Sequence, residues 1–584
     1  MKKLLLTLAI ATTGFWASSQ VICAGISPAA IEGNYTFTWA DPAGGGWSCP
    51  DFLIPGVFVQ DTLEMAEDGT PGLNAQGNPL SQEACSELDL TLSDVRGKIA
   101  VCYRGTCEFG SKAKNAQDSG AVALIIINRD PAPVGMGGGA EGGSVTIPVV
   151  MLGSADGAAL VAEMQNGPVV MFIGNKAGLY PNDAGLSKNT TLISKRTGVA
   201  SQLSVDGSEF NFDLGTRVTN WGTQDQTGMT LTANIDGPSG NVYNEVVTLP
   251  TVLAGDSLDI EPSQVLNFPT FSLASYDAGR YSLRYSIDLN GTTDDYDGDN
   301  VVTADFVISD SMYALAHLDE VTNLPVQTNG FRPSNNNSTF SNCIVFDDPN
   351  GSRVGVEGLY FSALGNSVDL TGEQIGVFVY EWQDVFTDLN DAALAFDNLA
   401  IVGNGFYTYP SDLQGETVYG ALDAPISLTD NQRYLFCAQT FNLDVFLGFD
   451  DNVNYLWNEG YYLQPLGPIE NDGAYFASGF GMEIVPAIGA RIRDAAGIGL
   501  EETGTIEGVA YPNPANDVVT IDIEATGIGA LIVTDLAGKE VMNTTLTLAN
   551  GSDKVDISSL EAGVYMFNVA LESGQSSSFS VVKQ

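Results

Sequence analysis

The sequence predicts a multidomain, mainly β protein with one α/β domain near its N-terminus. The chain has 584 residues, which is too long for a single hydrophobic core. Most of it consists of short segments of alternating hydrophobicity separated by glycine, proline, asparagine and aspartate, a pattern typical of strands and turns. Only residues 95–173 combine continuous apolar runs with helical spacing, which indicates strands that alternate with helices.

The α/β domain is expected within residues 20–185. Apolar runs predict its strands over 98–103, 121–127, 147–152 and 169–173. Helices are expected over 109–119 and 154–165, and Ser154 is expected to cap the second helix. The glycines of residues 135–143 predict a flexible loop.

The helical spacing disappears after about residue 195. Residues 195–308 are expected to form an immunoglobulin-like β-sandwich, and residues 310–495 a larger sandwich rich in aromatic residues. A linker rich in glycine and glutamate covers 497–507. A small C-terminal β-sandwich is then expected over 508–584.

Residues 1–19 have the features of a signal peptide. Two lysines follow the first Met, residues 4–11 form an apolar run too short to span a bilayer, and small residues precede Gln20. Cys23 is not expected to carry a lipid, because Ile22 occupies a position that a lipoprotein signal keeps small. No later apolar stretch reaches about 18 residues, so no transmembrane helix is expected.

The charge balance limits the possible partners. The chain has 71 acidic and 23 basic residues, which gives a formal net charge of -48 and a pI near 4.1. Such a chain repels nucleic acid and anionic lipid, so neither is expected as a partner. A well-solvated extracellular surface explains the acidity better than a specific acidic function does.

The C-terminal region contains an ordered series of turn motifs. It opens with Tyr511-Pro512-Asn513-Pro514, continues through Gly563-Val564-Tyr565 and ends near the basic residue Lys583. Together these motifs resemble the type A sorting domain of the type IX secretion system of Bacteroidota. The resemblance implies a β-sandwich recognised by that export machinery, in a protein secreted or attached to the outer membrane of a Gram-negative bacterium.

A second resemblance covers roughly residues 85–173. The matching motifs are Gly97-Lys98-Ile99-Ala100-Val101, Arg104-Gly105-Thr106-Cys107-Glu108-Phe109, Gly120-Ala121, Ile125-Ile126-Ile127-Asn128 and Ile147-Pro148-Val149-Val150-Met151. In this order they resemble the protease-associated (PA) domain. The resemblance implies a non-catalytic domain that accompanies proteases or receptors and binds peptide-like partners or shapes their access.

Seven cysteines in an exported chain predict disulfides, with one cysteine left over. Cys343 and Cys437 are the only cysteines of the predicted large sandwich, and both lie on expected strands, so they are expected to pair. The PA resemblance implies a bridging cysteine at Cys107, for which Cys85 is the best partner. A further pair of Cys49 with Cys102 would leave Cys23 unpaired.

The residue inventory argues against a histidine-dependent peptidase. His317 is the single histidine, whereas a zinc peptidase of the HExxH type needs two histidines one helical turn apart. No nucleophile motif of the Gly-x-Ser-x-Gly type is present, so His317 is interpreted as structural. Catalysis by paired carboxylates within residues 310–495 stays open, because acidic residues are abundant there.

Two further features each have two interpretations. Asp295, Asp297 and Asp299 alternate in an acidic cluster that could bind Ca²⁺, although a hairpin turn explains the cluster better. The aromatic residues of the 310–495 region could line a sugar-binding face, although core packing is the better interpretation.

Two classes of function follow from these observations. The favoured one is a secreted or surface-attached, non-catalytic binding or adhesion protein with a peptide, protein or glycan ligand. The alternative is an extracellular hydrolase, or a protein accessory to a peptidase, that uses carboxylates in the 310–495 region.

The signal peptide gives a direct prediction. The mature protein should begin at Gln20, because the small residues Ala17 and Ser19 suit signal peptidase. Mass spectrometry of the exported protein measures its N-terminus, and a start at Cys23 with an attached lipid would contradict the prediction.

Overall fold

The computed structural model describes residues 20–333, 335–366, 368–497, 508–523, 525–535, 539–548, 551–571 and 576–584. The expected signal peptide and most of the expected linker lie outside these residues. The chain divides into two compact units. The first contains the described residues up to Asn350, together with Glu357–Ala424 and Asn431–Ile492, and the second contains Gly351–Val356, Pro425–Asp430 and the described residues from Arg493 onward.

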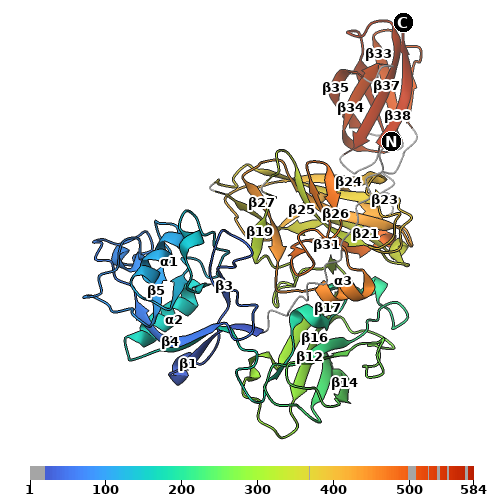
Figure 1. The fold of residues 1–584 in the computed structure, drawn as a ribbon. Helices are drawn as coiled ribbons and strands as arrows, with labels where there is room; N and C mark the ends of the chain where they lie inside the picture. Colours follow the sequence, from blue (N-terminus) through green and yellow to red (C-terminus); the bar gives the residue numbers. More distant parts are fainter. Residues whose placement is uncertain are drawn as a thin grey trace, which may run out of the picture. The chain divides into compact units, whose positions relative to one another are not determined.

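The N-terminal part of the first unit contains one mixed eight-stranded sheet with the order β2-β1-β8-β4-β5-β6-β7-β3 (Figure 1). Its strands are β1 (Val21–Ser27), β2 (Gly33–Asn34), β3 (Phe37–Trp39), β4 (Phe58–Met65), β5 (Ile99–Tyr103), β6 (Ala123–Ile127), β7 (Val149–Leu152) and β8 (Val170–Asn175). Strands β4, β5, β6 and β7 are parallel to one another. The helices α1 (Phe109–Asp118) and α2 (Ser154–Met164) follow β5 and β7.

Each helix covers one face of this sheet, because successive strand residues point to opposite faces. Ala100 and Cys102 of β5 pack in one buried cluster with Ala113 of α1. Ile99 and Val101 pack in another cluster, which also contains Leu160 of α2. Ser154 is the first residue of α2 and not its cap: Gly153 precedes the helix, and no side chain caps its first turn.

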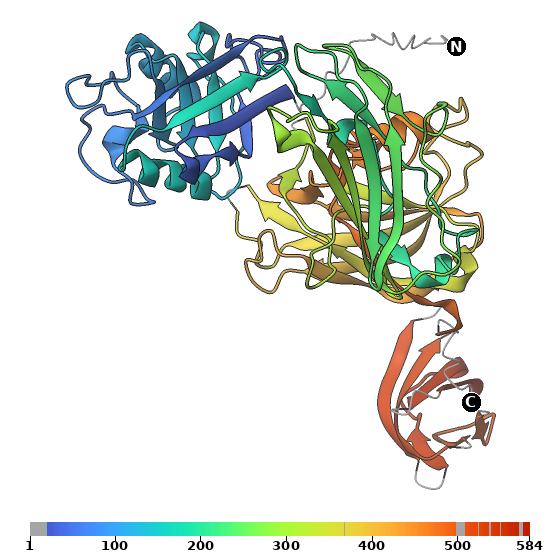
Figure 2. The same cartoon turned by 90° about the horizontal axis from the view of Figure 1, so that it is seen from below.

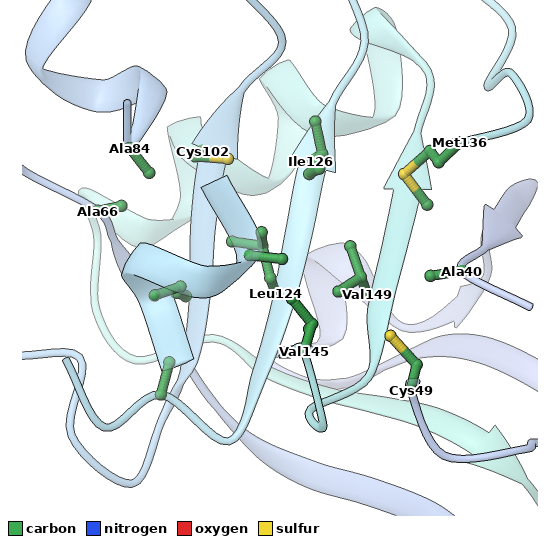
Figure 3. Packing of buried hydrophobic residues seen from close by; sticks show 14 of the residues in the cluster. Ala40, Cys49, Ala66, Ala84, Cys102, Leu124, Ile126, Met136, Val145 and Val149 are labelled. Carbon is green, nitrogen blue, oxygen red and sulfur yellow. The ribbon is translucent and has the colours of Figure 1, made fainter. Parts of the chain in front are cut away.

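The first of these clusters corrects one expected disulfide. Cys49 and Cys102 are both free and buried, and so is Cys23. Figure 3 shows the reason: Cys102 lies on β5, whereas Cys49 lies beside Val149, with Ile126 and Leu124 between them. Burial raises the pKa of the Cys49 and Cys102 thiols to about 12. These thiols therefore serve as small apolar core residues.

The next part of the first unit is formed mainly by β-strands. Strands β10 (Thr191–Leu192), β12 (Gly215–Asn220) and β15 (Ser257–Ile260) form one sheet, to which β9 (Ala184–Gly185) adds through β12. The long strands β13 (Thr230–Gly237), β14 (Gly240–Thr248), β16 (Gly279–Asp288) and β17 (Val301–Ser309) form one end of a nine-stranded sheet (Figure 2). Its order is β14-β13-β16-β17-β11-β18-β31-β21-β25.

A short strand makes that nine-stranded sheet continuous. β11 (Gly198–Ala200) pairs in parallel with β17 on one side and antiparallel with β18 (Met312–Ala314) on the other. The remaining strands of the sheet are β31 (Gly489–Asp494), β21 (Val354–Phe361) and β25 (Val418–Ser427). The boundary expected at residues 308–310 therefore falls within one sheet and is not a flexible linker.

Two further sheets belong to the region that follows. One has the order β19-β27-β22 with β30 on β27, and the other has the order β24-β23-β26-β20-β28-β29. Their bounds are β19 (Asn329–Phe331), β20 (Phe340–Phe346), β22 (Ala363–Gly365), β23 (Gln374–Trp382), β24 (Leu399–Thr408), β26 (Arg433–Thr440), β27 (Val445–Asp450), β28 (Ile469–Asn471), β29 (Ala474–Phe476) and β30 (Val485–Pro486).

The expectation that the 310–495 region contains only strands is wrong at one place. Helix α3 spans Leu456–Tyr462. Its buried Asn458 donates to the Ile193 carbonyl at 2.8 Å and accepts from the Ile193 N–H at 3.1 Å. The helix is therefore held by an earlier segment that is distant in sequence.

The six-stranded sheet contains a disulfide between Cys343 of β20 and Cys437 of β26, which are directly opposite each other. The aromatic residues of this region divide between core and surface. Trp382, Phe386, Tyr434, Phe436, Phe449 and Tyr455 are buried. Phe378 and Tyr380 are half-buried, and Phe441 is exposed.

The C-terminal part of the second unit contains two small sheets, with the orders β32-β33-β36 and β35-β34-β37-β38. The strands are β32 (Gly508–Tyr511), β33 (Val518–Ile523), β34 (Gly527–Asp535), β35 (Glu540–Leu548), β36 (Ser552–Asp556), β37 (Gly563–Leu571) and β38 (Ser576–Lys583). Apolar residues of both sheets, among them Ile521 and Phe567, share one core. The protein is thus multidomain and mainly β, with one α/β sheet. Within the described residues, no helix is both long and apolar enough to cross a membrane.

Candidate functional site

The loop between β5 and α1 is fixed in place by a disulfide and a buried carboxylate. Cys107 in this loop is bonded to Cys85, one of the two pairs singled out from the sequence. The buried Glu83 accepts hydrogen bonds from the backbone N–H of Thr106 at 2.9 Å and from its hydroxyl at 3.1 Å. Gly105 is required here, because a Cβ atom would lie about 2 Å from the Glu83 carboxylate.

The buried Lys112 of α1 completes this support. Its ammonium donates to the Glu83 carbonyl at 2.6 Å. Burial alone would raise the pKa of Glu83, but hydrogen bonds from Thr106 and Asn74 and the charge of Lys112 lower it. Burial lowers the pKa of Lys112, against the attraction of Glu83 and other nearby anionic groups. The loop therefore rests on a satisfied polar network, which holds its backbone in one conformation.

Two arginines lie side by side above this loop. Arg104 follows β5 and Arg129 follows β6, and parallel strands bring their carboxyl ends to the same edge of a sheet. Arg104 donates to the Asn128 side chain at 2.9 Å and lies over the Phe109 ring at 5.5 Å. Both arginines contact Asp130 at 3.6 Å. Burial and the neighbouring Arg129 lower the pKa of Arg104.

The arginines form one wall of an open cleft of about 520 Å³, which we call the arginine cleft. The 104–109 loop forms its floor, and Gly137 and Gly139 of the glycine-rich loop close its other side. Glu108 fixes that loop by accepting from the Ala140 N–H at 2.9 Å. Asp130 contacts both guanidinium groups, and the exposed Glu108 also lines the cleft, so the two arginines offer directed donors to a carboxylate in a site whose charges are balanced.

The C-terminal turn motif and the last strand also come together. The Asn513 side chain donates to the Ser580 carbonyl and accepts from the Val582 N–H, both at 2.8 Å. Gly563 is paired with Lys583 between β37 and β38, and the Tyr565 hydroxyl donates to the Glu561 carbonyl. Lys583 lies 3.7 Å from Asp517. Tyr511, Pro512 and Pro514 are exposed and flank Asn513.

Asp295, Asp297 and Asp299 are not arranged as a metal site. Asp295 accepts from the Asn182 N–H at 2.8 Å, Asp297 is exposed, and Asp299 is mostly buried against Lys176. In the described part of the chain, no group of three His, Cys, Asp or Glu side chains is placed to hold a metal ion.

Asp299 instead belongs to a buried charge cluster. The ammonium of Lys176 lies 2.5 Å from Asp183 and 3.0 Å from Asp299, and it also faces the Tyr296 ring at 4.4 Å. Burial raises the pKa of Asp183 to about 6 and that of Asp299 to about 7, because one ammonium does not offset the desolvation of two carboxylates.

His317 has a backbone role and lines a cavity. Its N–H donates to the buried Asp450 carboxylate at 2.7 Å, and its carbonyl accepts from Val326. The cavity has a volume of about 290 Å³ and is lined by residues of β17, among them Phe306, and by Thr197 and Asn454.

Comparison with known families accounts for both ends of the chain. Residues 65–160 match the PA domain, and residues 509–583 match the secretion system C-terminal sorting domain. The chain carries a PA domain and a type IX sorting domain. The sorting domain implies export by the type IX system, and therefore secretion or attachment at the cell surface. The arginine cleft lies within the PA domain.

Individual relatives at 30% identity or more match over a small part of the chain. The aminopeptidase YwaD of Bacillus subtilis (strain 168) is 35% identical over 108 residues, which cover 18% of this chain and 24% of the relative. The ER degradation-enhancing alpha-mannosidase-like protein 3 of Xenopus laevis is 37% identical over 111 residues, which cover 18% and 12%. A solved aminopeptidase from Aneurinibacillus sp. strain AM-1 is similar over 27% of this chain and 31% of that one, with 21% identity and a TM-score of 0.19. The chain thus spans a quarter or less of the length of these curated relatives.

Sequence reasoning found the loop of the arginine cleft but not its second arginine. Arg129 follows the expected strand over 121–127, just as Arg104 follows the expected strand over 98–103. The placement of both arginines within two residues of a strand end is the signal that could have paired them. The charge cluster at Lys176 had no comparable signal, because its members are up to 123 residues apart, at positions 176 and 299.

The sorting domain generates a prediction about export. Deletion of residues 508–584 should leave the remaining chain in the periplasm, because the module that the export machinery recognises is lost. Surface labelling of intact cells measures this, with a periplasmic marker as the control for leakage. Labelling of the truncated protein at the level of the full chain would contradict it.

The buried charge cluster generates a pH prediction. The folded state binds a proton at Asp299 more tightly than the unfolded state does, since its pKa rises from 3.8 to about 7. The preference of the folded state for protonated Asp299 contributes fully to stability below pH 3.8, and this contribution is lost as the pH rises through about 7. Asp299→Asn, which needs no proton, should therefore gain stability relative to the wild type as the pH rises.

Chemical denaturation at several pH values measures this difference in the free energy of unfolding. Asp297→Asn is the matched control, because Asp297 is exposed on the same short helix, η7 (Asp297–Asp299). A difference between Asp299→Asn and the wild type that does not change with pH would contradict the prediction.

Proposed function

We propose that this protein is a non-catalytic surface binding protein whose PA domain holds the acidic groups of an extracellular peptide or protein in the arginine cleft. The observation that carries the proposal is the pair Arg104 and Arg129 at adjacent strand ends. Arg129 is 50% exposed at its side chain, and Arg104 is kept in place by Asn128 and Phe109. A planar guanidinium fixed in this way favours a bidentate contact with a carboxylate.

The rigid floor of the cleft supports the same function. The Cys85–Cys107 disulfide and the Glu83 network hold the 104–109 loop, so little conformational entropy is lost when a ligand binds. The cleft is open and its volume of about 520 Å³ would accept several atoms of a peptide terminus or side chain.

The range of relatives supports a binding role over a catalytic one. Each match to them is about 110 residues long, and their names include both an aminopeptidase and a mannosidase-like protein. Short matches to such differently named proteins support an accessory role over the chemistry of either.

The alternative is a hydrolase that uses carboxylates of residues 310–495. Burial raises the pKa of Asp384, Asp450 and Glu459 in this region. Each of these carboxylates has an internal partner: Arg433, the His317 backbone and the Ser478 hydroxyl, respectively. Such partners favour structural roles over catalysis, and this favours the binding function.

The binding function predicts a defined loss in a double variant. Arg104→Ala combined with Arg129→Ala should weaken the binding of peptides with a free C-terminal carboxylate at least about tenfold, since two charge-assisted contacts are removed. Binding of the mature protein to a fluorescent peptide library measures this, with C-terminally amidated peptides as a ligand control.

Arg96→Ala is the matched control variant, because Arg96 is exposed and paired with Asp94 outside the cleft. Equal binding by the double variant and the wild type would exclude the arginine cleft as the site. The same library should stay uncleaved with Zn²⁺ or Ca²⁺ present. Cleavage that survives His317→Ala would favour the carboxylate hydrolase, and cleavage lost in this variant would overturn the non-catalytic function through a histidine-dependent site.

A further inference from the structure

The outer face of the six-stranded sheet carries a row of aromatic rings from three neighbouring strands. Strand register places Phe378 opposite Cys437 of β26 and Gly376 opposite Phe406 of β24. Because side chains alternate along a strand, Phe378, Tyr380 and Phe406 lie on the same face as Cys437. Phe441 follows β26 with the same alternation, and its ring is 6.4 Å from that of Phe406.

These four rings, Phe378, Tyr380, Phe406 and Phe441, are here called the aromatic platform. Phe406 is 55% exposed and Phe441 48% exposed, and the other two rings are half-buried. The opposite face of the same strands carries buried apolar residues such as Val377 and Val379. On the platform face, Phe378 and Tyr380 pack against a small buried cluster that contains Cys437 and Leu435, and the rings beyond this cluster, Phe406 and Phe441, are exposed. Exposed aromatic rings gathered on one outer face indicate a binding surface.

The rings form one continuous aromatic surface across β24, β23 and the end of β26. Ring centroids are 6.0 Å apart between Tyr380 and Phe378, and 6.1 Å apart between Phe378 and Phe406. The Phe378 ring lies against the backbone at Gly376, where a Cβ atom would be 2.4 Å from it. Gly376 therefore lets this ring lie along the sheet.

The platform is stiff, and it is covered at one end only. The Cys343–Cys437 disulfide lies on the same face and joins β26, which neighbours the platform strand β23, to β20. Toward Trp382, the same face is covered by Phe386 and Phe396, whose rings lie 4.7 Å and 4.4 Å from Trp382. Beyond that cover the face is open at Phe406 and Phe441.

Polar groups lie beside the rings on the same face. Gln439 is opposite Gly376 and Ser341 is opposite Gln439, so all three share this face. The Gln439 amide donates to the Ser341 hydroxyl at 3.0 Å, and the buried Glu470 accepts from Ser341 at 3.1 Å. Glu470 and Ser341 are buried, so together they fix the half-buried Gln439 amide next to the aromatic rings.

We propose that the aromatic platform binds a neutral polysaccharide chain. Pyranose rings have apolar faces that stack on aromatic rings, and their hydroxyl edges exchange hydrogen bonds with amide and hydroxyl side chains. A continuous aromatic surface with polar groups beside it is complementary to such a chain. The proposal deepens the binding function proposed above, but it concerns a different surface from the arginine cleft.

The charges around the platform select a neutral ligand over an anionic one. Glu470 lies beside the rings, and Asp423 accepts from Asn404, which shares the platform face. The arginine of this face, Arg433, lies at the covered end, where Asp384 and Asp347 neutralise it. An acidic polysaccharide would therefore meet carboxylates and not cations at the open end.

Affinity electrophoresis of the mature full chain tests the proposal. The gels contain a soluble β-glucan, a xylan, a galactomannan or a dextran as neutral probes, and polygalacturonate as the anionic probe. At least one neutral polymer should retard the wild-type protein, and polygalacturonate should not. Phe406→Ala combined with Phe441→Ala should lower the affinity for that polymer at least about tenfold, since each ring supplies about 1 kcal/mol or more.

Phe476→Ala is the matched control. Phe476 is 50% exposed on β29 of the same sheet, but its neighbour Tyr475, and not Phe476, points to the platform face through the register with Glu470. This control should bind like the wild type. Because Phe406, Phe441 and Phe476 are exposed, the Phe406→Ala/Phe441→Ala protein and the Phe476→Ala protein should both keep the wild-type unfolding temperature. Gly376→Val is a further variant of the platform, because its side chain displaces the Phe378 ring without removing it.

Three results would overturn the proposal: no retardation by any neutral polymer, retardation by polygalacturonate instead, or equal retardation of the wild type and the Phe406→Ala/Phe441→Ala protein. The arginine double variant separates this proposal from the peptide-binding function. It should lose peptide binding and keep polymer retardation, whereas the aromatic double variant should do the opposite. A negative binding result at one site therefore does not affect the test of the other site.

Discussion

A three-residue strand, β11, is the constraint on which the β-rich part of the first unit depends. Gly198 is paired in parallel with Val307 and antiparallel with Ala314, so this short segment joins strands that would otherwise be the edges of two separate sheets. The Thr197 hydroxyl also donates to the Ala314 carbonyl. A ladder of this kind satisfies backbone groups that would be exposed at two sheet edges. The His317 cavity lies along this seam because it is lined by Thr197, which directly precedes β11, and by Phe306 of β17.

The acidic composition gives the few basic residues unusual importance. Lys112, Lys176 and Arg433 are all buried, and each is used to fix a loop, a charge cluster or a sheet end. Basic residues that serve the interior in this way do not contribute to surface recognition. Against the net charge of -48, the partly exposed pair Arg104 and Arg129 balances the nearby carboxylates of Asp130 and Glu108, so the cleft is less negative than the protein as a whole. An anionic group near the protein is repelled over long distances and attracted only at short range, which favours specificity over rapid association.

Much of the α/β fold was predictable because its signals are local. The run over 98–103 became β5, and the helix expected over 109–119 became α1, one residue shorter. The sorting domain was predictable for a similar reason, since its turn residues follow one another in a fixed order. By contrast, β11 has three residues, and its partners lie more than 100 residues away, so no periodicity could reveal it. Helix α3 has seven residues and is stabilised by Asn458 contacts with Ile193, again a tertiary effect. For the arginine cleft, the sequence predicted the loop that contains Arg104. The parallel pairing of β5 and β6, which the sequence did not reveal, brings Arg129 beside it.

The three unpaired cysteines have a consequence for how the protein matures. In the folded chain, Cys23, Cys49 and Cys102 are buried, and their raised pKa values leave almost no thiolate to attack a disulfide. During folding, however, all seven thiols are accessible, and wrong pairings compete with the two correct ones. Formation of the α/β core buries the thiols of Cys23, Cys49 and Cys102. Once buried, these thiols no longer compete with the cysteines that form the two correct disulfides. A chain that reaches an oxidising compartment with this core unformed would be a substrate for disulfide shuffling, whereas the folded one is inert to it.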